Sequence, residues 1–286
     1  MILVTGGTGN VGRHVVAQLL ERGAGVRVLT RSPASAVVPE GAEVAGGDLA
    51  DPTTLDAALE GVASVFLVWP TLSADHAAPV TIEAIAKRVG HAGRIVYLSS
   101  NGASGDAGPE TILGSHALLE RLIERSGPEW TFLRPGGFAT NTLMWASQIR
   151  DTGVVRWAHG AASRPLIHER DIAAVGVSAL TGEGHGGARY VLTGPETLTQ
   201  VEQVHAIGEA LGRPVRWEEL APESALQEMI AQGWPAALAE GVLGAHAQMV
   251  TATEPVTSTV EEVTGAPATP FRQWATDHAK DFGAPA

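Results

Sequence analysis

Short apolar runs alternate with stretches of helical periodicity along the first half of the chain. The runs that read as strands are residues 1–5, 25–30, 42–46, 64–69, 94–99 and 130–134. Between them, apolar residues recur every three or four positions over 11–20, 80–89 and 115–125, as expected for helices that bury one face. Asp51 and Pro52 favour one more helix start, because Asp caps a helix and Pro suits its first position.

This alternation predicts an α/β fold of the Rossmann type, a doubly wound parallel sheet. Short links between alternating strands and helices are typical of βαβ units. Strands in such a sheet are covered on both faces, which agrees with the unbroken apolar runs Val65–Val68 and Ile95–Leu98.

The rhythm changes after Pro135. Residues 136–165 show no clean alternation, whereas 171–180 reads as a helix capped by Asp171 and 189–193 as a strand. From residue 198 onward the pattern is mostly helical, over 199–211, 222–232, 235–250 and 270–282. We therefore expect a nucleotide-binding domain of residues 1–136, to which 166–195 return, and a smaller, mostly helical substrate or partner lobe of 137–165 and 196–286.

Composition narrows the function classes. The formal charge is −12 and there are only two lysines, so direct binding of nucleic acid is not expected. The chain has no cysteine, which excludes disulfides and thiolate chemistry and fits a cytoplasmic location. No apolar run is long enough to span a bilayer, so no membrane partner is expected either.

A glycine-rich segment follows the first strand and opens the first helix. Gly6, Gly9 and Gly12 form the pattern G-x-x-G-x-x-G, with Thr8, Asn10 and Val11 between them. Such glycines allow a tight turn, close approach of a pyrophosphate and close packing of helix on strand. The helix N-terminus then presents N–H groups to the phosphates. The pattern in this context predicts a dinucleotide site.

The ends of the second and third strands indicate which dinucleotide. NAD sites place an acidic residue after the second strand, but here Thr30 is followed by Arg31 and Ser32. A guanidinium can grip a 2′-phosphate, so we expect NADP(H), with Arg31 as the discriminating residue and Arg13 as a weaker candidate. Asp48 and Leu49 end the third strand where adenine would lie, although Asp48 serves a turn equally well.

With these motifs the chain resembles the atypical short-chain dehydrogenases, in particular the NmrA-like and quinone-reductase-like NAD(P)H-binding group. The resemblance runs over nearly the whole length and includes the segments 5–12, 30–32, 47–49, 116–120, 130–135, 167–172, 192–195 and 271–274, with Phe138 and Asn141. It implies the fold and the cofactor. It leaves the reaction open, because the group contains reductases, redox sensors that regulate transcription and biosynthetic enzymes.

One departure from the resemblance concerns the proton relay. Short-chain dehydrogenases use Tyr-x-x-x-Lys, and the positions that align with this motif hold Ile112 and His116. Neither Tyr97 nor Tyr190 is followed by lysine four residues later. His116 is therefore our candidate both for contact with the nicotinamide ribose and for catalysis, with a histidine on the helix surface as the alternative.

Further candidates come from segments expected near the nicotinamide. Ser99 ends a central strand, and Pro135 and Phe138 follow another, at the edge where doubly wound sheets bind ligands. A pocket for a flat ligand is expected from five residues, some of which core packing would explain as well. These five are Trp69, Phe138, Asn141, Met144 and Trp145, of which Trp69 and Phe138 are also candidates for cofactor contact. His168 and Asp171 we interpret as structural, and no histidine spacing indicates a metal.

The function that the sequence favours is an NADPH-dependent oxidoreductase acting on a small aromatic, quinone-like or enone substrate. Delocalisation of charge in such a product makes a strong acid less necessary. Two alternatives stay open, namely a non-catalytic NADP(H) sensor that binds a partner protein and a cofactor-assisted enzyme of aromatic natural-product biosynthesis. A homodimer is compatible with the sequence, which does not fix the oligomeric state.

Overall fold

The computed structural model describes residues 1–69, 77–103, 108 and 111–284. Contacts divide the chain into two compact units, each with a core of its own. The nucleotide unit comprises residues 1–135, 169–192 and 259–266, and the second unit comprises 136–168, 193–258 and 267–286. Among the helices that the structure describes, none combines the length and the apolarity needed to cross a bilayer.

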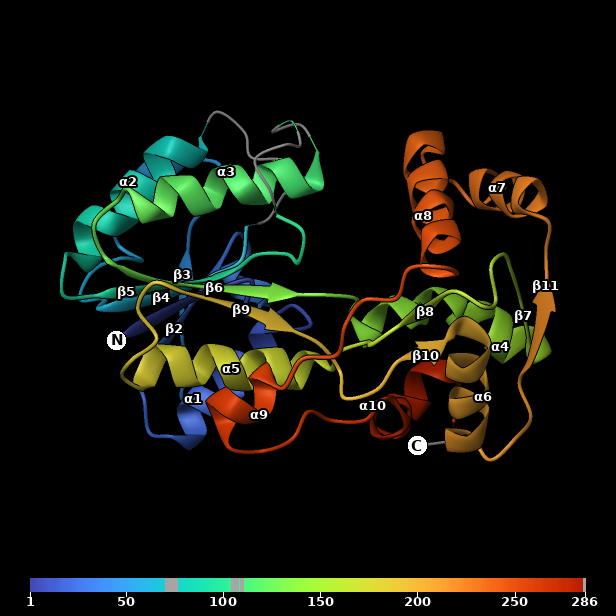
Figure 1. Ribbon diagram of the computed structural model, residues 1–286. Coiled ribbons are helices and arrows are strands. Elements are labelled where there is room, and N and C mark those ends of the chain that lie inside the picture. Colours follow the sequence, from blue (N-terminus) through green and yellow to red (C-terminus); the bar gives the residue numbers. More distant parts are fainter. Residues whose placement is uncertain (70–76, 104–107, 109–110, 285–286) are drawn as a thin grey trace. The chain divides into compact units, whose positions relative to one another are not determined.

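The nucleotide unit is built on a seven-stranded parallel sheet, as the sequence predicts (Figure 1). The strand order is β3-β2-β1-β4-β5-β6-β9. Strands β2 and β3 are added on one side of β1 and strands β4 to β9 on the other, so the strand order reverses between β1 and β4. The strands are β1 (Ile2–Thr5), β2 (Val26–Thr30), β3 (Glu43–Gly46), β4 (Ser64–Leu67), β5 (Arg94–Leu98), β6 (Glu129–Pro135) and β9 (Ala188–Leu192). Such a reversal is where doubly wound sheets bind ligands, at the carboxyl ends of the strands.

Helices cover both faces of this sheet (Figure 1). On one face lie α1 (Gly12–Glu21), α5 (Glu169–Thr181) and α9 (Thr259–Thr264). On the other lie α2 (Ala78–Val89) and α3 (Ile112–Glu124). Side chains alternate between the two faces of the sheet along each strand. On β5, the side chains of Ile95 and Tyr97 lie on the face that α2 and α3 cover.

Two local predictions in this unit are wrong. The helix expected from Asp51 and Pro52 is a single 3-10 turn, η2 (Pro52–Thr54), although the Asp51 carboxylate does cap it by accepting from the Thr53 N–H. Asp171 does not cap the helix that follows, because α5 already begins at Glu169 and Asp171 lies in its first turn. A carboxylate there still faces the positive end of the helix dipole. Another short turn, η1 (Pro33–Ser35), follows β2.

The second unit is more irregular than the first. It contains η3 (Ala139–Trp145), α4 (Ala146–Thr152), α6 (Gln200–Ala210), α7 (Pro222–Ala231), α8 (Ala236–Met249), α10 (Phe271–Asp277) and η4 (Ala279–Phe282). Two small sheets join them, one pairing β7 (Val154–Trp157) with β11 (Arg216–Glu219) and one pairing β8 (Ser163–Arg164) with β10 (Leu198–Thr199). Its core is rich in aromatic residues, among them Trp145, Trp157, Phe271, Trp274 and Phe282.

The irregular stretch 136–165 thus holds a 3-10 helix, an α-helix and two short strands that the sequence pattern did not reveal. Residues 259–266 also differ from expectation, since α9 packs on α5 and β9 of the nucleotide unit instead of the smaller lobe. A six-residue helix has too few apolar positions to show which surface it will cover.

Candidate functional site: a nucleotide cleft and a separate cavity

The glycine segment forms a tight turn between β1 and α1. Gly6 has a φ of +63°, which favours glycine, and its carbonyl accepts from the N–H of Gly9 at 2.9 Å. Gly12 packs so closely that a Cβ there would lie 2.1 Å from the Gly6 carbonyl oxygen. The Thr5 hydroxyl donates to the Val68 carbonyl and accepts from the Val68 N–H, which holds the end of β1 against the end of β4. The turn is therefore fixed by backbone contacts that no larger residue would permit.

The start of α1 is open to a ligand. No described side chain caps this end of the helix, and its first turn contains no acidic residue. The first turn of a helix leaves N–H groups without intrahelical partners and carries a positive partial charge. Thr8, Gly9 and Asn10 are exposed beside it, whereas Val11 is buried. This arrangement is suited to an anion such as a pyrophosphate.

A cleft of about 200 Å³ runs from this turn across the ends of β2 and β3. It is lined by Thr5, Gly6, Thr8, Leu29, Thr30, Arg31, Gly47, Asp48, Leu49 and Val68. Arg31 is exposed, and within the described part of the chain its guanidinium makes no hydrogen bond or ion pair. Arg13, by contrast, reaches the buried carboxylate of Glu169 at 3.4 Å. Of the two arginines, Arg31 is the one available to a ligand in the cleft.

Asp48 and Leu49 lie at the far end of this cleft. One carboxylate oxygen of Asp48 accepts from the Ala50 N–H at 3.0 Å, which is the turn role considered above. The second oxygen leaves room for a ligand bond, because a carboxylate offers about four acceptor positions. Leu49 is buried and its carbonyl accepts from the Thr81 hydroxyl at 2.7 Å, so the segment is anchored to α2.

A buried polar network lies between α3 and the ends of β5 and β6. Glu120 is 4% exposed and accepts from the Ser99 hydroxyl at 2.5 Å. Arg134 donates to both of its oxygens, at 2.9 and 2.5 Å, and this pairing raises the pKa of the guanidinium. The Ser99 hydroxyl, expected near the nicotinamide, is thus committed to Glu120. Pro135 ends β6, and its carbonyl accepts from the Asn101 N–H at 2.9 Å, which ties the two strand ends together.

His116 lies one turn before Glu120 on α3 and contacts the same strand. Its Nδ1 lies 2.6 Å from the hydroxyl of Tyr97, which is fully buried on β5. Burial lowers the pKa of His116, against the opposing effect of the Glu120 charge. Burial, together with Glu120, raises the pKa of Tyr97. Sequence analysis did not find this contact, or Glu120 and Arg134, although positions 116 and 120 share a helix face and 97 and 99 share a strand face.

The second unit has a cavity of its own, about 50 Å³ in volume. Its lining comprises Asn141, Thr142, Met144, Trp145, Ala162, Arg164, Leu166, Gln200, Gln203, His246 and Met249. Five of these also line a neighbouring hollow of about 310 Å³, to which Trp234, Val242 and Ala245 contribute. Three of the five predicted pocket residues, Asn141, Met144 and Trp145, thus meet in one cavity.

The other two predicted pocket residues lie elsewhere. Trp69 is buried in the core of the nucleotide unit, between the sheet and α2. Phe138 forms a β-bridge with Ile167 just before η3 and is absent from the lining that the structure describes. Arg164, His246 and Met249 take part instead, and they come from segments too distant in sequence to be grouped by spacing.

The two basic residues that line this cavity, Arg164 and His246, leave no unpaired charge facing it. Arg164 donates to both oxygens of Glu254, at 3.2 and 2.9 Å. Burial, with the positive charges of Arg164 and His159, lowers the pKa of His246 to about 4. At neutral pH the imidazole is therefore uncharged, and its Nδ1 accepts from the Trp157 indole N–H at 3.3 Å. The cavity consequently offers aromatic, thioether and neutral polar surface.

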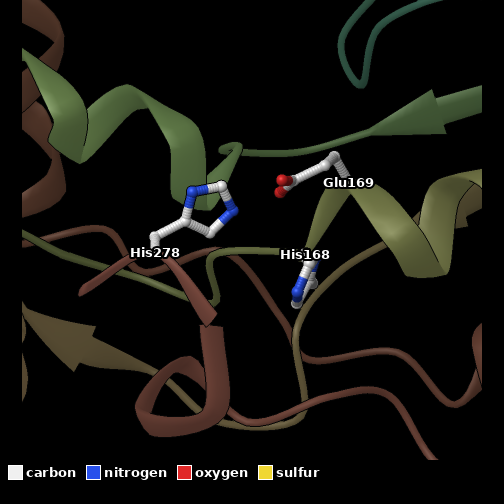
Figure 2. Close-up of side chains that lie close together, drawn as sticks. All are labelled: His168, Glu169 and His278. Carbon is white, nitrogen blue, oxygen red and sulfur yellow. The ribbon is translucent and has the colours of Figure 1, made fainter. Parts of the chain in front are cut away.

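His168, Glu169 and His278 are drawn in Figure 2. His168 Nε2 lies 3.3 Å from the Asp277 carboxylate, and His278 Nδ1 lies 2.7 Å from that of Asp281. The His278 ring stacks on Trp274, with centroids 4.5 Å apart. The two histidines thus pair with residues of their own unit, the second unit. Glu169 pairs with Arg13, and both belong to the nucleotide unit. We therefore interpret all three side chains as part of the packing.

Comparison with known proteins agrees with the fold. The NmrA-like family matches residues 1–275. The chain belongs to this family. A (4-alkanoyl-5-oxo-2,5-dihydrofuran-3-yl)methyl phosphate reductase of Streptomyces griseus is 42% identical over 99% of both chains. An NAD(P)H azoreductase of Xenophilus azovorans is 38% identical over 99% of this chain and 100% of its own.

Solved structures give the same picture. An NADPH-dependent quinone oxidoreductase of Escherichia coli, solved with NADPH, superposes with a TM-score of 0.77 at 25% identity, covering 97% of this chain and 99% of its own. The triphenylmethane reductase of Citrobacter sp. superposes with a TM-score of 0.78 over 98% of this chain and 100% of its own, at 21% identity, and so shares the fold.

Proposed function

We propose that this chain is an NADPH-dependent reductase that passes a hydride to a flat conjugated acceptor, such as a quinone or an enone. The observation that carries the proposal is that the glycine turn and the unpaired guanidinium of Arg31 open on one cleft. A pyrophosphate would bind at the glycine turn, and a 2′-phosphate would pair with the Arg31 guanidinium.

The described residues fit NADP(H) on physical grounds. Within the described residues no side chain caps the start of α1, and the exposed Gly9 beside it has no side chain to keep a phosphate away. Arg31 would fork onto the 2′-phosphate, and no acidic side chain follows β2 to repel it. Asp48 and Leu49 would border the adenine. When bound, the nicotinamide supplies the hydride.

The relatives support a conjugated acceptor. The name of the Streptomyces enzyme describes an unsaturated lactone with a carbonyl substituent and a methyl phosphate, and the names of the other two refer to an azo compound and a quinone. In an acceptor of this kind, the hydride would add to an electrophilic atom, a π bond would break, and the electron pair would be delocalised before a proton from water completes the reduction. Such a product needs less acid assistance than an isolated alkoxide, which agrees with the absence of Tyr-x-x-x-Lys from the sequence.

His116 is the residue that we assign to hydrogen bonding at this centre. Its pKa is lowered by burial, so the ring is neutral at physiological pH and has one N–H to donate. We assign that N–H to the nicotinamide ribose or to the acceptor oxygen on which charge develops. The strand ends at Ser99 and Pro135 would support the nicotinamide by shape, since the Ser99 hydroxyl already serves Glu120.

We assign the acceptor to the cavity of the second unit, where Asn141, Met144 and Trp145 meet. Aromatic and thioether surface suits a flat conjugated ring. Because Arg164 is paired with Glu254 and His246 is neutral, nothing in the lining calls for a charged substituent. The lining therefore suits the uncharged, conjugated part of an acceptor.

A turnover screen tests the proposal. NADPH oxidation would be followed with a naphthoquinone, a cyclic enone, an azo dye and a simple aliphatic ketone. We expect at least one of the conjugated acceptors to be reduced and the ketone to remain. Rapid reduction of the ketone would contradict the conjugated-acceptor assignment. NADPH that binds but is never oxidised, whatever the acceptor, would favour a non-catalytic sensor instead.

A further inference from the structure

The contact between Tyr97 and His116 joins two elements that the sequence keeps apart. Tyr97 points from β5 toward α3, with its hydroxyl 2.6 Å from His116 Nδ1 and the two rings tilted at 41°. One helical turn further on, Glu120 meets Ser99 of the same strand. Two contacts, one helical turn apart, thus attach α3 to the end of β5. In the contact that contains His116, the partner on the strand is the uncharged Tyr97.

Hydrogen-bond accounting decides which atom carries the proton. Tyr97 is fully buried, and within the described residues Nδ1 of His116 is the one hydrogen-bond partner of its hydroxyl. If Nδ1 carried a hydrogen, the phenolic hydrogen would have no acceptor, which costs about 1–3 kcal/mol for a buried group. If Nδ1 is bare, the hydroxyl donates to it and both groups are satisfied. The imidazole proton then belongs on Nε2.

The charges around the pair agree with this arrangement. From α3, Glu120 is the nearest acid, and its carboxylate is forked by Arg134 of β6, while Arg189 of β9 lies 4.0 Å from it. The raised pKa of Tyr97 keeps the phenol protonated, so that it remains a donor. The lowered pKa of His116 keeps the imidazole neutral, so that Nδ1 remains an acceptor.

We propose that Tyr97 is a positioning residue, which holds His116 as the Nε2–H tautomer with that N–H on the ring edge turned away from β5. The idea rests on the proposed function in assigning that N–H to the ribose or the acceptor oxygen. The chain therefore replaces a tyrosine oriented by lysine with a histidine oriented by tyrosine. Tyr97 itself touches neither cofactor nor acceptor.

The chain contains a matched control for this pair. Tyr190 of β9 makes the same kind of contact, with its hydroxyl 2.8 Å from Nδ1 of His185. Tyr97→Phe and Tyr190→Phe each remove one hydroxyl and keep the ring. An effect on stability or solubility should appear in both variants. An effect on the His116 tautomer should appear only in Tyr97→Phe.

The test is nitrogen NMR of the histidine side chains in the full-length protein. In the wild type we expect His116 Nδ1 to show the shift of a bare nitrogen and Nε2 that of a protonated one. Tyr97→Phe should add signal from the Nδ1–H form and raise the His116 pKa by about half a unit to one unit, because the lost bond favoured the neutral ring. Tyr190→Phe should leave His116 unchanged.

Addition of NADP⁺ should shift the His116 Nε2–H signal in the wild type, and less in Tyr97→Phe. A proton on Nδ1 in the wild type, or a tautomer and pKa indifferent to Tyr97→Phe, would overturn the proposal. So would an Nε2–H signal that NADP⁺ and acceptor both leave unmoved. Since these readouts need no turnover, failure of the reductase assignment would show separately, as NADPH that is never oxidised.

Discussion

We expect the choice between NADPH and NADH to depend on one side chain, that of Arg31. It is exposed at the end of β2, lines the cleft and makes no hydrogen bond or ion pair with other described residues. Arg31→Ala should therefore weaken NADPH binding and leave NADH binding nearly unchanged. A charge-assisted hydrogen bond contributes about 1.5–3 kcal/mol, which corresponds to roughly tenfold to a hundredfold in affinity. Calorimetric titration of both cofactors measures the effect.

Arg13→Ala is the comparison for Arg31→Ala. Because Arg13 is directed to Glu169, its removal should not alter the ratio of NADPH to NADH affinity. Equal loss of both cofactors in Arg31→Ala, or equal affinities in the wild type, would mean that Arg31 does not discriminate. Higher salt should reduce the preference, because an exposed guanidinium is screened.

His116 supports a second prediction at this scale. His116→Ala should lower turnover or NADPH affinity, by roughly fivefold to thirtyfold in kcat/KM if one hydrogen bond of about 1–2 kcal/mol is lost. His116→Gln should recover part of this, because its amide can place an N–H near the position of Nε2. Steady-state kinetics with circular dichroism as a check on the fold will measure both. Wild-type kinetics in His116→Ala would identify it as a helix-surface residue.

At the scale of elements, the β1–α1 turn depends on close backbone approach. Gly12→Ala would place a Cβ 2.1 Å from the Gly6 carbonyl oxygen, so the turn must open. We expect NADPH affinity to fall at least about tenfold and stability to fall by about 1–3 kcal/mol, the usual cost of overpacking. Thermal unfolding and calorimetry measure the two effects.

Gly244→Ala provides the control for Gly12→Ala. A Cβ at Gly244 would meet nothing within 4 Å, and the residue lies within α8. This substitution should stabilise the protein by about 0.5–1 kcal/mol and leave NADPH binding alone, because alanine is the better helix former. If Gly12→Ala bound NADPH as the wild type does, the close contact would not matter for the cleft.

The elements of the nucleotide unit could be predicted from sequence because their pattern is local. Each strand is a short apolar run and each long helix has one apolar face, so period alone locates β1, β4, β5 and α1. The predictions at Pro52 and at the start of α5 were wrong because Asp is common in helix caps, in turns and in the first turn of a helix. The shape of 139–157 depends on packing within the second unit, which no local pattern encodes.

The sites show the same division between local and tertiary information. Residues 6–12 and Arg31 belong to short contiguous motifs, and Gly6, Thr8 and Arg31 line one cleft. The Tyr97–His116 contact joins residues 19 positions apart on different elements, and Arg164–Glu254 residues 90 apart. Such pairs exist only once a helix is packed on a strand or a loop on a cavity. Spacing therefore predicted Asn141, Met144 and Trp145 as one segment but not their partner His246.

His246 makes the second unit sensitive to acid. Its pKa is lowered from 6.5 to about 4 by burial and by Arg164 and His159, so the folded protein resists its protonation. The unfolded chain takes up the proton near pH 6.5, and the stability that the neutral state confers is lost as pH falls from there toward 4. The shift alone corresponds to about 3 kcal/mol, reduced to roughly 2 by partial exposure.

Denaturant unfolding between pH 7 and 4 will measure this loss. His246→Gln should flatten the profile in that window relative to the wild type, since glutamine does not titrate and can still accept from Trp157. His205→Gln is the comparison, because it removes an exposed imidazole on α6 that does not line the cavity. Identical profiles for the wild type and His246→Gln would show that this imidazole is not held neutral.

At the scale of the whole molecule, each of the two units has a candidate binding site of its own. The cleft is lined by residues of the nucleotide unit alone, and the cavity by residues of the second unit alone. Substitutions in one should therefore act on one ligand. Arg31→Ala should raise the KM for NADPH and leave that for the acceptor, whereas Met144→Ala should do the reverse.

The expected size of the Met144 effect follows from the apolar surface that it offers. Loss of two or three methylene-sized contacts costs about 1.5–2.5 kcal/mol, hence roughly tenfold to seventyfold in the KM for a quinone or enone when that KM reflects binding. NADPH affinity should stay within about twofold of the wild type. Val37→Ala, at a residue that is 90% exposed, is the control that should change neither constant. If Met144→Ala weakened NADPH and acceptor equally, or neither, the cavity would not be the acceptor site, and the division of labour between the two units would have to be drawn elsewhere.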